Sequence, residues 1–390
     1  MPQPNARRAG ARRAGARRAG ARRALPARLL GVAAAIALLA TACSATADGA
    51  DPEPTGPAQE LRLGYFANVT HTPALVGVAT GAFEDALGET ELTTQVFNAG
   101  PAAIEALNAG AVDAAFLGPS PAINGFVQSE GESLRIVAGA AAGGAQLVVR
   151  PGIDEPADLE SGIVASPQLG GTQDVALRTW LTANGLENTL SGRGDVTVTP
   201  TENAQTLQLF RDGDIDGAWV PEPWASRLVL EAGGEVLVDE RDLWPDGEFL
   251  TTHLVVATSF LERHPETVSA LIAGELEALD WVAEHPEEAK ALVNDEIEAA
   301  TTRRLADDVL DRAFTNVTFT ADPLAGTLEQ LLADGVAAGT TRPASLEGIY
   351  DLRLLNAALA ERERPPVSAA GLGPDDAEHG PSPEGTTPAE

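Results

Sequence analysis

Cysteine is almost absent from this chain, since Cys43 is the only one among its 390 residues. A single cysteine rules out an internal disulfide and a thiolate metal cluster. Aromatic residues are scarce, at 4%, and Lys290 is the one lysine. What the chain does have is an ordinary hydrophobic share of 44%, with 39 glycines and 27 prolines, which predicts a sizeable core connected by many loops. Its length is sufficient for about two domains.

Several enzyme motifs are missing as well. The sequence has no Gly-x-Ser-x-Gly, no His-Glu-x-x-His and no Gly-x-x-x-x-Gly-Lys segment. The histidines lie far apart, without the spacing of metal ligands. They are His71, His253, His264, His285 and His379. We therefore expect no catalytic residues, no metal and no cofactor.

The first 42 residues have the pattern of an export signal. A basic five-residue repeat without acids occupies 6–24, and the apolar run LLGVAAAIALL at 29–39 has the length of a signal-peptide core and is short for a membrane span. The run leads into ATAC, which resembles the bacterial lipobox and predicts lipidation of Cys43. Ala40 stands where that pattern prefers leucine, and a plain signal peptide with an incidental cysteine is the alternative.

The charge excludes two classes of partner. The formal net charge is −31, and removal of 1–42, which holds nine arginines and no acid, would leave 17 basic against 57 acidic residues, or −40. Nucleic acids and anionic membranes would repel such a chain. A site for an anion would have to be built from local donors, because the long-range field repels the ligand.

The rest of the chain divides into a folded region and two polar ends. Residues 43–60 are small, polar and rich in proline, which indicates a flexible tether, and 363–390 combine proline, glycine and acids without periodicity, which indicates disorder. Between them, strand and helix patterns alternate, which predicts an α/β fold with parallel strands. We expect one lobe to comprise 61–150 and 250–362, with 151–249 inserted as the second.

Five segments carry a family resemblance when they are taken in order: GYFANVTHTPALVGVATGAFE, NAGPAAIEALNAGAVDAAFLGPSPAI, ASPQLGGTQDVALRTWL, DGDIDGAWVPEPWASRL and FLERHPETVSALIAG. They make residues 61–360 resemble the solute-binding proteins of ABC importers, specifically the aliphatic-sulfonate, nitrate and taurine group. The resemblance implies a type II periplasmic-binding-protein fold, with a ligand cleft between two α/β lobes. It also implies a monomer that captures a small anion, with an aliphatic sulfonate favoured, and delivers it to a membrane permease and its ATPase.

Other interpretations stay open at this stage. The ligand could be nitrate, taurine or a pyrimidine precursor, and the protein could sense a ligand without importing it. An enzyme on the same fold, like the pyrimidine synthases, is a further alternative, although those use a cysteine-rich motif that is missing here. Together with the export signal, the resemblance implies a lipoprotein held to the outer face of the cell membrane through Cys43.

The stretch ASPQLGGTQDVALRTWL, residues 165–181, is the first candidate for the ligand site. Gly170 and Gly171 let the backbone turn and approach a ligand closely, and Thr172 can cap the helix that follows. The N–H groups around Thr172 and Gln173 could receive an anionic group with the help of the helix dipole. An ordinary capped loop is the alternative.

Other candidates are polar groups at the expected strand ends. Asn68, His71 and Thr72 follow the first strand, and Ser120 follows a later one, so each could form hydrogen bonds with a ligand. Gln146 lies near the expected crossing between the lobes.

The segment WVPEPW resembles the Trp-x-Glu-Pro segment of the family. Trp219 or Trp224 could wall the hydrocarbon part of an organic ligand, and core positions are the alternative for both. Glu222 would repel an anion inside the site, so we expect it to form a structural or inter-lobe hydrogen bond. His253 could approach the cleft from behind.

Overall fold

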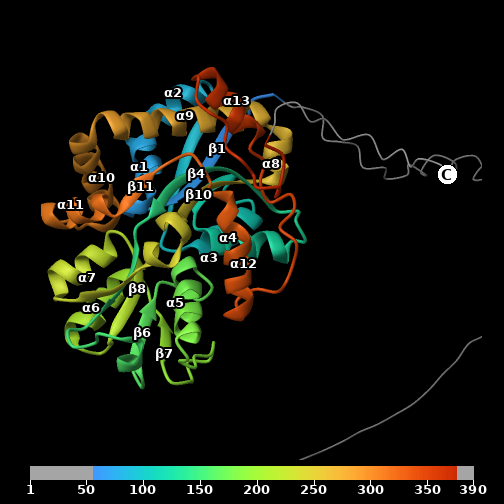
Figure 1. The fold of residues 1–390 in the computed structure, drawn as a ribbon. Helices are drawn as coiled ribbons and strands as arrows, with labels where there is room; N and C mark the ends of the chain where they lie inside the picture. The colour runs from blue at the N-terminus through green and yellow to red at the C-terminus, as the bar shows by residue number, and fades with distance from the viewer. Residues whose placement is uncertain (1–55, 376–390) are drawn as a thin grey trace, which may run out of the picture. The chain divides into compact units, whose positions relative to one another are not determined.

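The computed structural model describes residues 56–375. The export signal, Cys43, most of the expected tether and the end of the tail lie outside these residues. The described part contains two β-sheets that are flanked by helices (Figure 1), which confirms the α/β prediction. Within this part, no helix is both long enough and apolar enough to span a membrane.

The first lobe is built on a six-stranded sheet. Its strands are β1 (Glu60–Phe66), β2 (Glu91–Phe97), β3 (Ala114–Leu117), β4 (Leu134–Gly143), β10 (Leu250–Ala257) and β11 (Val317–Phe319). Their order across the sheet is β11-β4-β10-β3-β1-β2. The expected parallel pairing holds for β1 with β2 and β3, whereas β10 runs antiparallel to both of its neighbours. Most residues of β10 are buried, as in a strand covered on both faces.

Helices cover this sheet and add their apolar side chains to one large core. They are α1 (Thr72–Ala79), α2 (Ala82–Leu87), α3 (Gly100–Asn108), α4 (Pro119–Gln128), α8 (Thr258–Arg263), α9 (Pro265–Glu284), α10 (Pro286–Thr301), α11 (Asp307–Thr315), α12 (Leu328–Ala337) and α13 (Arg353–Glu361). Proline begins α9 and α10, where the missing N–H costs nothing and the fixed φ suits a helix start.

The second lobe contains a five-stranded sheet in the order β7-β6-β8-β5-β9. The strands are β5 (Ala145–Val149), β6 (Ile163–Ser166), β7 (Thr197–Pro200), β8 (Gly217–Pro221) and β9 (Glu235–Asp239), and the helices are α5 (Thr172–Ala183), α6 (Asn203–Asp212) and α7 (Trp224–Ala232). Alternation along β8 sends Trp219 into one core cluster and its neighbours Ala218 and Val220 into another. Short 3₁₀ helices complete the described chain: η1 (Val69–His71), η2 (Pro156–Leu159), η3 (Glu240–Leu243), η4 (Pro245–Gly247) and η5 (Ala325–Thr327).

The boundary between the lobes differs from the expected one. Residues 145–149 were expected in the first lobe, but as β5 they pair with β8 and β9 of the second sheet. The chain crosses between the sheets at Gly143 and Gly144, each with φ of 71°, a conformation that glycine adopts without strain.

Both polar ends are shorter than expected. Ala58, which was placed in the 43–60 tether, is buried and donates its N–H to Oγ1 of Thr267 over 2.8 Å. In the 363–390 tail, residues up to 375 pack on the first lobe, because Leu372 is buried and Asn356 donates to the carbonyl of Val367. Composition alone missed these segments, since they are ordered by contacts with residues far along the chain.

Candidate ligand-binding site

A cavity of about 40 Å³ lies where the strand ends of the two lobes meet, and we call it the cradle cavity. Among the described residues that line it, none carries a charged side chain. Its polar lining consists of Asn68, Thr70, His71, Asn98, Gln168, Thr172, Gln173, Asn203 and Thr251. The cavity therefore offers hydrogen-bond donors without a cationic side chain.

Five helices begin at this cavity, namely α1, α3, α4, α5 and α6. Within the described chain, no side chain caps the first turn of any of them. The first N–H groups of a helix have no intrahelical partner, and the helix dipole adds partial positive charge at that end. Proline in the first turn of α1, α3 and α4 removes some of these donors, so α5 and α6 present the fuller sets. The convergence of these helix starts makes the cradle cavity suited to an anion.

The start of α5 is held in place by a buried ion pair. Asp174 Oδ2 accepts the N–H of Gly170 and the Nε–H of Arg178, each over 3.0 Å, and Oδ1 accepts the hydroxyl of Ser166 over 2.6 Å. Both charged side chains are almost fully buried. Gly170 has φ of 74°, so the turn requires a residue that tolerates a left-handed backbone. The pair fixes the loop that presents Thr172 to the cavity.

Two buried polar atoms of the cavity lining have no hydrogen-bond partner among the described residues, Oγ1 of Thr172 and Oδ1 of Asn203. Leaving such an atom unpaired costs about 1–3 kcal/mol. An oxyanion would offset this cost at Thr172, whose hydroxyl can donate to it, but not at the Asn203 amide oxygen, which only accepts. Gly118 faces Thr172 from the other lobe, and a Cβ at this position would lie 2.3 Å from Oγ1 of Thr172. The lobes approach this closely because residue 118 has no side chain.

His71 is a neutral hydrogen-bonding group in this site. Its Nδ1 accepts the N–H of Phe66 over 3.4 Å, and the two rings lie 4.3 Å apart between centroids. Burial lowers the pKa of His71 to about 3. The ring is therefore uncharged at neutral pH and carries its proton on Nε2, as a single donor.

A second cavity of about 370 Å³, which we call the adjoining cavity, shares Phe66, Asn68, Asn98 and Asn203 with the cradle cavity. Trp224 lines it, and its Nε1 donates a hydrogen bond of 2.9 Å to Oδ1 of Asn68. This bond connects the second lobe to the first.

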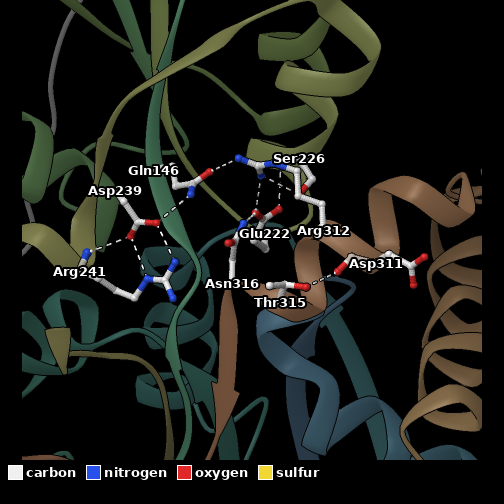
Figure 2. A network of polar contacts seen from close by, with 9 residues as sticks. All are labelled: Gln146, Glu222, Ser226, Asp239, Arg241, Asp311, Arg312, Thr315 and Asn316. Atoms are coloured by element: carbon white, nitrogen blue, oxygen red, sulfur yellow. Dashed lines mark hydrogen bonds and ion pairs between the residues drawn. The ribbon is translucent and has the colours of Figure 1, made fainter.

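Glu222 belongs to a polar network that links the lobes (Figure 2). Its Oε1 accepts from Arg312 over 3.0 Å and from Asn316 over 2.7 Å, and Arg312 also donates to Oε1 of Gln146 over 2.7 Å. Burial raises the pKa of Glu222, and its hydrogen bonds and the Arg312 charge offset part of that rise. Because α11 carries Arg312 and continues into β11, the network ties the second lobe to the six-stranded sheet.

The structure brings half of the predicted site residues together. Asn68, His71, Gly171, Thr172 and Gln173 line the cradle cavity. The structure places the other five predicted residues outside both cavities: Thr72, Ser120, Gln146, Trp219 and Glu222. Glu222 instead forms the inter-lobe hydrogen bonds expected of it, and Gln146 joins the same network.

The reasons are local for Thr72, Ser120 and Trp219. The Thr72 hydroxyl donates to the carbonyl of Val69 inside the first turn of its own helix. Ser120 is buried in the first turn of α4. Trp219 is fully buried in the second-lobe core, where its Nε1 donates to Oε2 of Glu240 over 2.7 Å. His253 is buried next to Tyr350 and reaches neither cavity.

Asn98 and Asn203 were missed by the sequence analysis. Asn98 directly follows β2 and precedes α3, and Asn203 begins α6 shortly after β7. This is the pattern that singled out Asn68, a polar residue between the end of a strand and the start of a helix. Applied evenly along the chain, it would have found both.

Two lobes with a cavity at their strand ends define the fold class of the periplasmic binding proteins, and solved structures agree. The periplasmic nitrate-binding protein NrtA from Synechocystis PCC 6803 matches with a TM-score of 0.68 and 17% identity over 83% of this chain and 93% of that chain. The alkanesulfonate-binding protein SsuA from Xanthomonas axonopodis pv. citri, bound to MOPS, matches with a TM-score of 0.61 and 20% identity over 73% of this chain and 95% of that chain.

The chain belongs to the NMT1-like family, which it matches over residues 54–296, more than half of its length. Among characterised relatives, it is similar to the taurine-binding periplasmic protein of Escherichia coli strain K12, with 28% identity over 225 residues. That alignment covers 57% of this chain and 66% of the relative, just under two thirds of its length.

Proposed function

We propose that this protein is the extracytoplasmic substrate-binding component of an ABC importer and that it captures a small oxyanion, with an aliphatic sulfonate favoured. The observation that carries the proposal is the convergence of five uncapped helix starts on a cavity without charged lining residues. Such a site stabilises a single negative charge with neutral donors and helix dipoles. This local arrangement would favour an anion even though the whole chain has a formal net charge of −31.

The sizes of the two cavities support a ligand with a hydrocarbon part. A cavity needs a volume of about 10–15 Å³ to hold one water molecule. The cradle cavity, of about 40 Å³, therefore holds a headgroup of a few heavy atoms. The adjoining cavity, with about 370 Å³ and walls that include Phe66 and Trp224, has room for a short organic chain. The relatives named for taurine, alkanesulfonate and nitrate binding support an oxyanion in general.

Delivery would follow from closure of the lobes. The closed form holds the ligand away from water and presents both lobes to a membrane permease driven by its ATPase, without chemistry on the ligand. Lipidation at Cys43 would keep the mature monomer at the outer face of the membrane. Replacement of Cys43 by serine should release the protein from the membrane fraction, and retention in that fraction would refute the anchor.

A thermal-shift screen tests the binding function. The panel holds alkanesulfonates, taurine, nitrate, sulfate, bicarbonate and pyrimidines. A ligand at a hundredfold excess over Kd stabilises the folded state by about 2.7 kcal/mol and raises the Tm. Thr172→Ala should reduce the shift, while Thr182→Ala, at the exposed end of the same helix, should not. If only pyrimidines raise the Tm, the ligand class is pyrimidines and not oxyanions. If no solute raises the Tm, binding of these solutes is refuted.

A further inference from the structure

The adjoining cavity differs from the cradle cavity in its charge. Arg211, Arg227 and Arg303 line it, and Glu202 is the one acidic side chain among its described lining residues. In a chain with a net charge of −31, an excess of positive charge around one cavity does not follow from composition. The excess therefore needs an explanation in the site itself.

Arg227 carries most of this argument because it is nearly buried, with 9% of its side chain exposed. Its Nε and Nη2 donate to the two carboxylate oxygens of Glu231 over 3.1 and 3.2 Å. Arg211 donates to the same carboxylate over 2.6 Å. The single carboxylate of Glu231 thus forms ion pairs with two guanidinium groups. These three side chains together have a net charge of +1.

The third nitrogen of this guanidinium, Nη1 of Arg227, makes no hydrogen bond with any residue of 56–375. This nitrogen is not among the buried side-chain atoms that lack a partner, so it is accessible from the adjoining cavity and its donor is available to a ligand. Guanidinium groups bind carboxylate oxygens with short, charge-assisted hydrogen bonds. The open donor of Arg227 therefore suits the far end of a ligand that enters this cavity.

A continuous path of lining residues leads from the cradle cavity to Arg227. Asn68 lines both cavities and accepts the hydrogen bond of Trp224. The Arg227 guanidinium lies over the Trp224 ring, 4.8 Å from its centroid. A short hydrocarbon chain that starts at the cradle cavity can follow the indole and end at the guanidinium.

We propose that the ligand is bifunctional, with an oxyanion headgroup in the cradle cavity and a second anionic group that binds Arg227. The inference rests on the proposed function and names the ligand class of that site. It also predicts discrimination, because an ammonium group at the far end would meet guanidinium groups of the same sign.

Calorimetric titration with three matched sulfonates tests this inference. In 3-sulfopropanoate, 1-propanesulfonate and taurine, the same sulfonate and two methylene groups carry a carboxylate, a methyl or an ammonium group. We expect 3-sulfopropanoate to bind at least about tenfold more tightly than 1-propanesulfonate, and taurine to bind most weakly. Arg227→Gln should cost 3-sulfopropanoate at least about tenfold in affinity and cost 1-propanesulfonate much less.

Arg304→Gln is the matched control, since it removes the same charge from an exposed site that lines neither cavity. It should leave all three affinities and their order unchanged. Equal affinities of the wild type for the three sulfonates, or tightest binding of taurine, would overturn the inference and leave the proposed function intact. If the folded wild type binds none of them but another oxyanion of the panel raises its Tm, the inference fails and the proposed function stands for that oxyanion. If no solute of the panel binds, both fail. The wild-type series decides the question even if Arg227→Gln does not fold.

Discussion

The indole of Trp224 donates a hydrogen bond of 2.9 Å to Oδ1 of Asn68, and these two residues belong to different lobes and line the same cavity. Asn68 also lines the cradle cavity, so the bond lies where the two cavities meet. It forms only when the lobes are close together. We therefore expect capture of a ligand and closure of the lobes to be coupled at this point.

Trp224→Phe tests that coupling. The change keeps an aromatic wall in the adjoining cavity but removes the donor to Asn68, and a hydrogen bond of this kind contributes about 0.5–1.5 kcal/mol. We expect a threefold to tenfold loss of ligand affinity by calorimetry, roughly the equivalent of that energy, with a small change in Tm. Unchanged affinity would show that the bond plays no part in closure.

Asp174→Asn tests the ion pair behind the cradle cavity. Arg178 would keep a buried charge without its partner, and such losses cost about 3–5 kcal/mol. Urea unfolding should show this loss. Asp295→Asn is the control, because it removes an exposed partner of Arg304, and exposed pairs contribute about 0–1 kcal/mol. A loss no larger than the control's would mean that the pair does not stabilise the loop.

The alternation of strands and helices was sufficient to predict the α/β fold, because the apolar runs and the turn residues between them are local signals. The same reasoning found Thr172, whose position at a helix start is set by the glycines before it. Trp219 and Trp224 show the limit. They lie five residues apart with similar neighbours, and only the placement of β8 at the centre of a sheet sends the first into the core.

Contacts between distant residues could not be predicted from one sequence. Arg312 reaches Gln146 and Glu222, which precede it by 166 and 90 residues. Nothing in the local pattern of α11 distinguishes Arg312 from a solvated arginine. The crossing at Gly143 and Gly144 was misplaced for a related reason, because the hydrophobic pattern of a strand does not say which sheet it joins.

The network in Figure 2 predicts a strong effect of Arg312→Met. Glu222 is fully buried, and loss of its cationic partner should cost about 3–5 kcal/mol in urea unfolding. The double variant Arg312→Met with Glu222→Gln should recover part of the loss, because it also removes the buried charge. Lys290→Met, in an exposed cluster, serves as the control. If the loss of stability in the double variant equals the sum of the losses in the two single variants, a direct interaction between Arg312 and Glu222 is contradicted.

The pH dependence of stability follows from the low pKa of His71. Burial lowers this pKa to about 3 in the folded state, whereas the unfolded chain titrates near its usual value of about 6.5. Below about pH 6.5 the unfolded state binds the extra proton, so stability is present above that pH and is lost as the pH falls toward the folded pKa.

His71→Gln isolates this contribution, because the other titrating groups are common to both proteins. As the pH falls below about 6.5, the wild type should lose stability relative to the variant. The loss in unfolding free energy should be up to about 1.4 kcal/mol for each pH unit. Urea unfolding at neutral and acid pH measures it. A difference that does not change with pH would show that His71 is not held neutral by the fold.

The central claim is that the cradle cavity binds a single negative charge with neutral donors and helix starts. Calorimetric titration with 1-propanesulfonate and its uncharged analogue 1-propanesulfonamide tests it most directly, because the two have almost the same shape. We predict that the sulfonate binds at least about a hundredfold more tightly, since helix starts and hydrogen-bond donors stabilise the charge. Equal affinities, or tighter binding of the sulfonamide, would contradict an anion site.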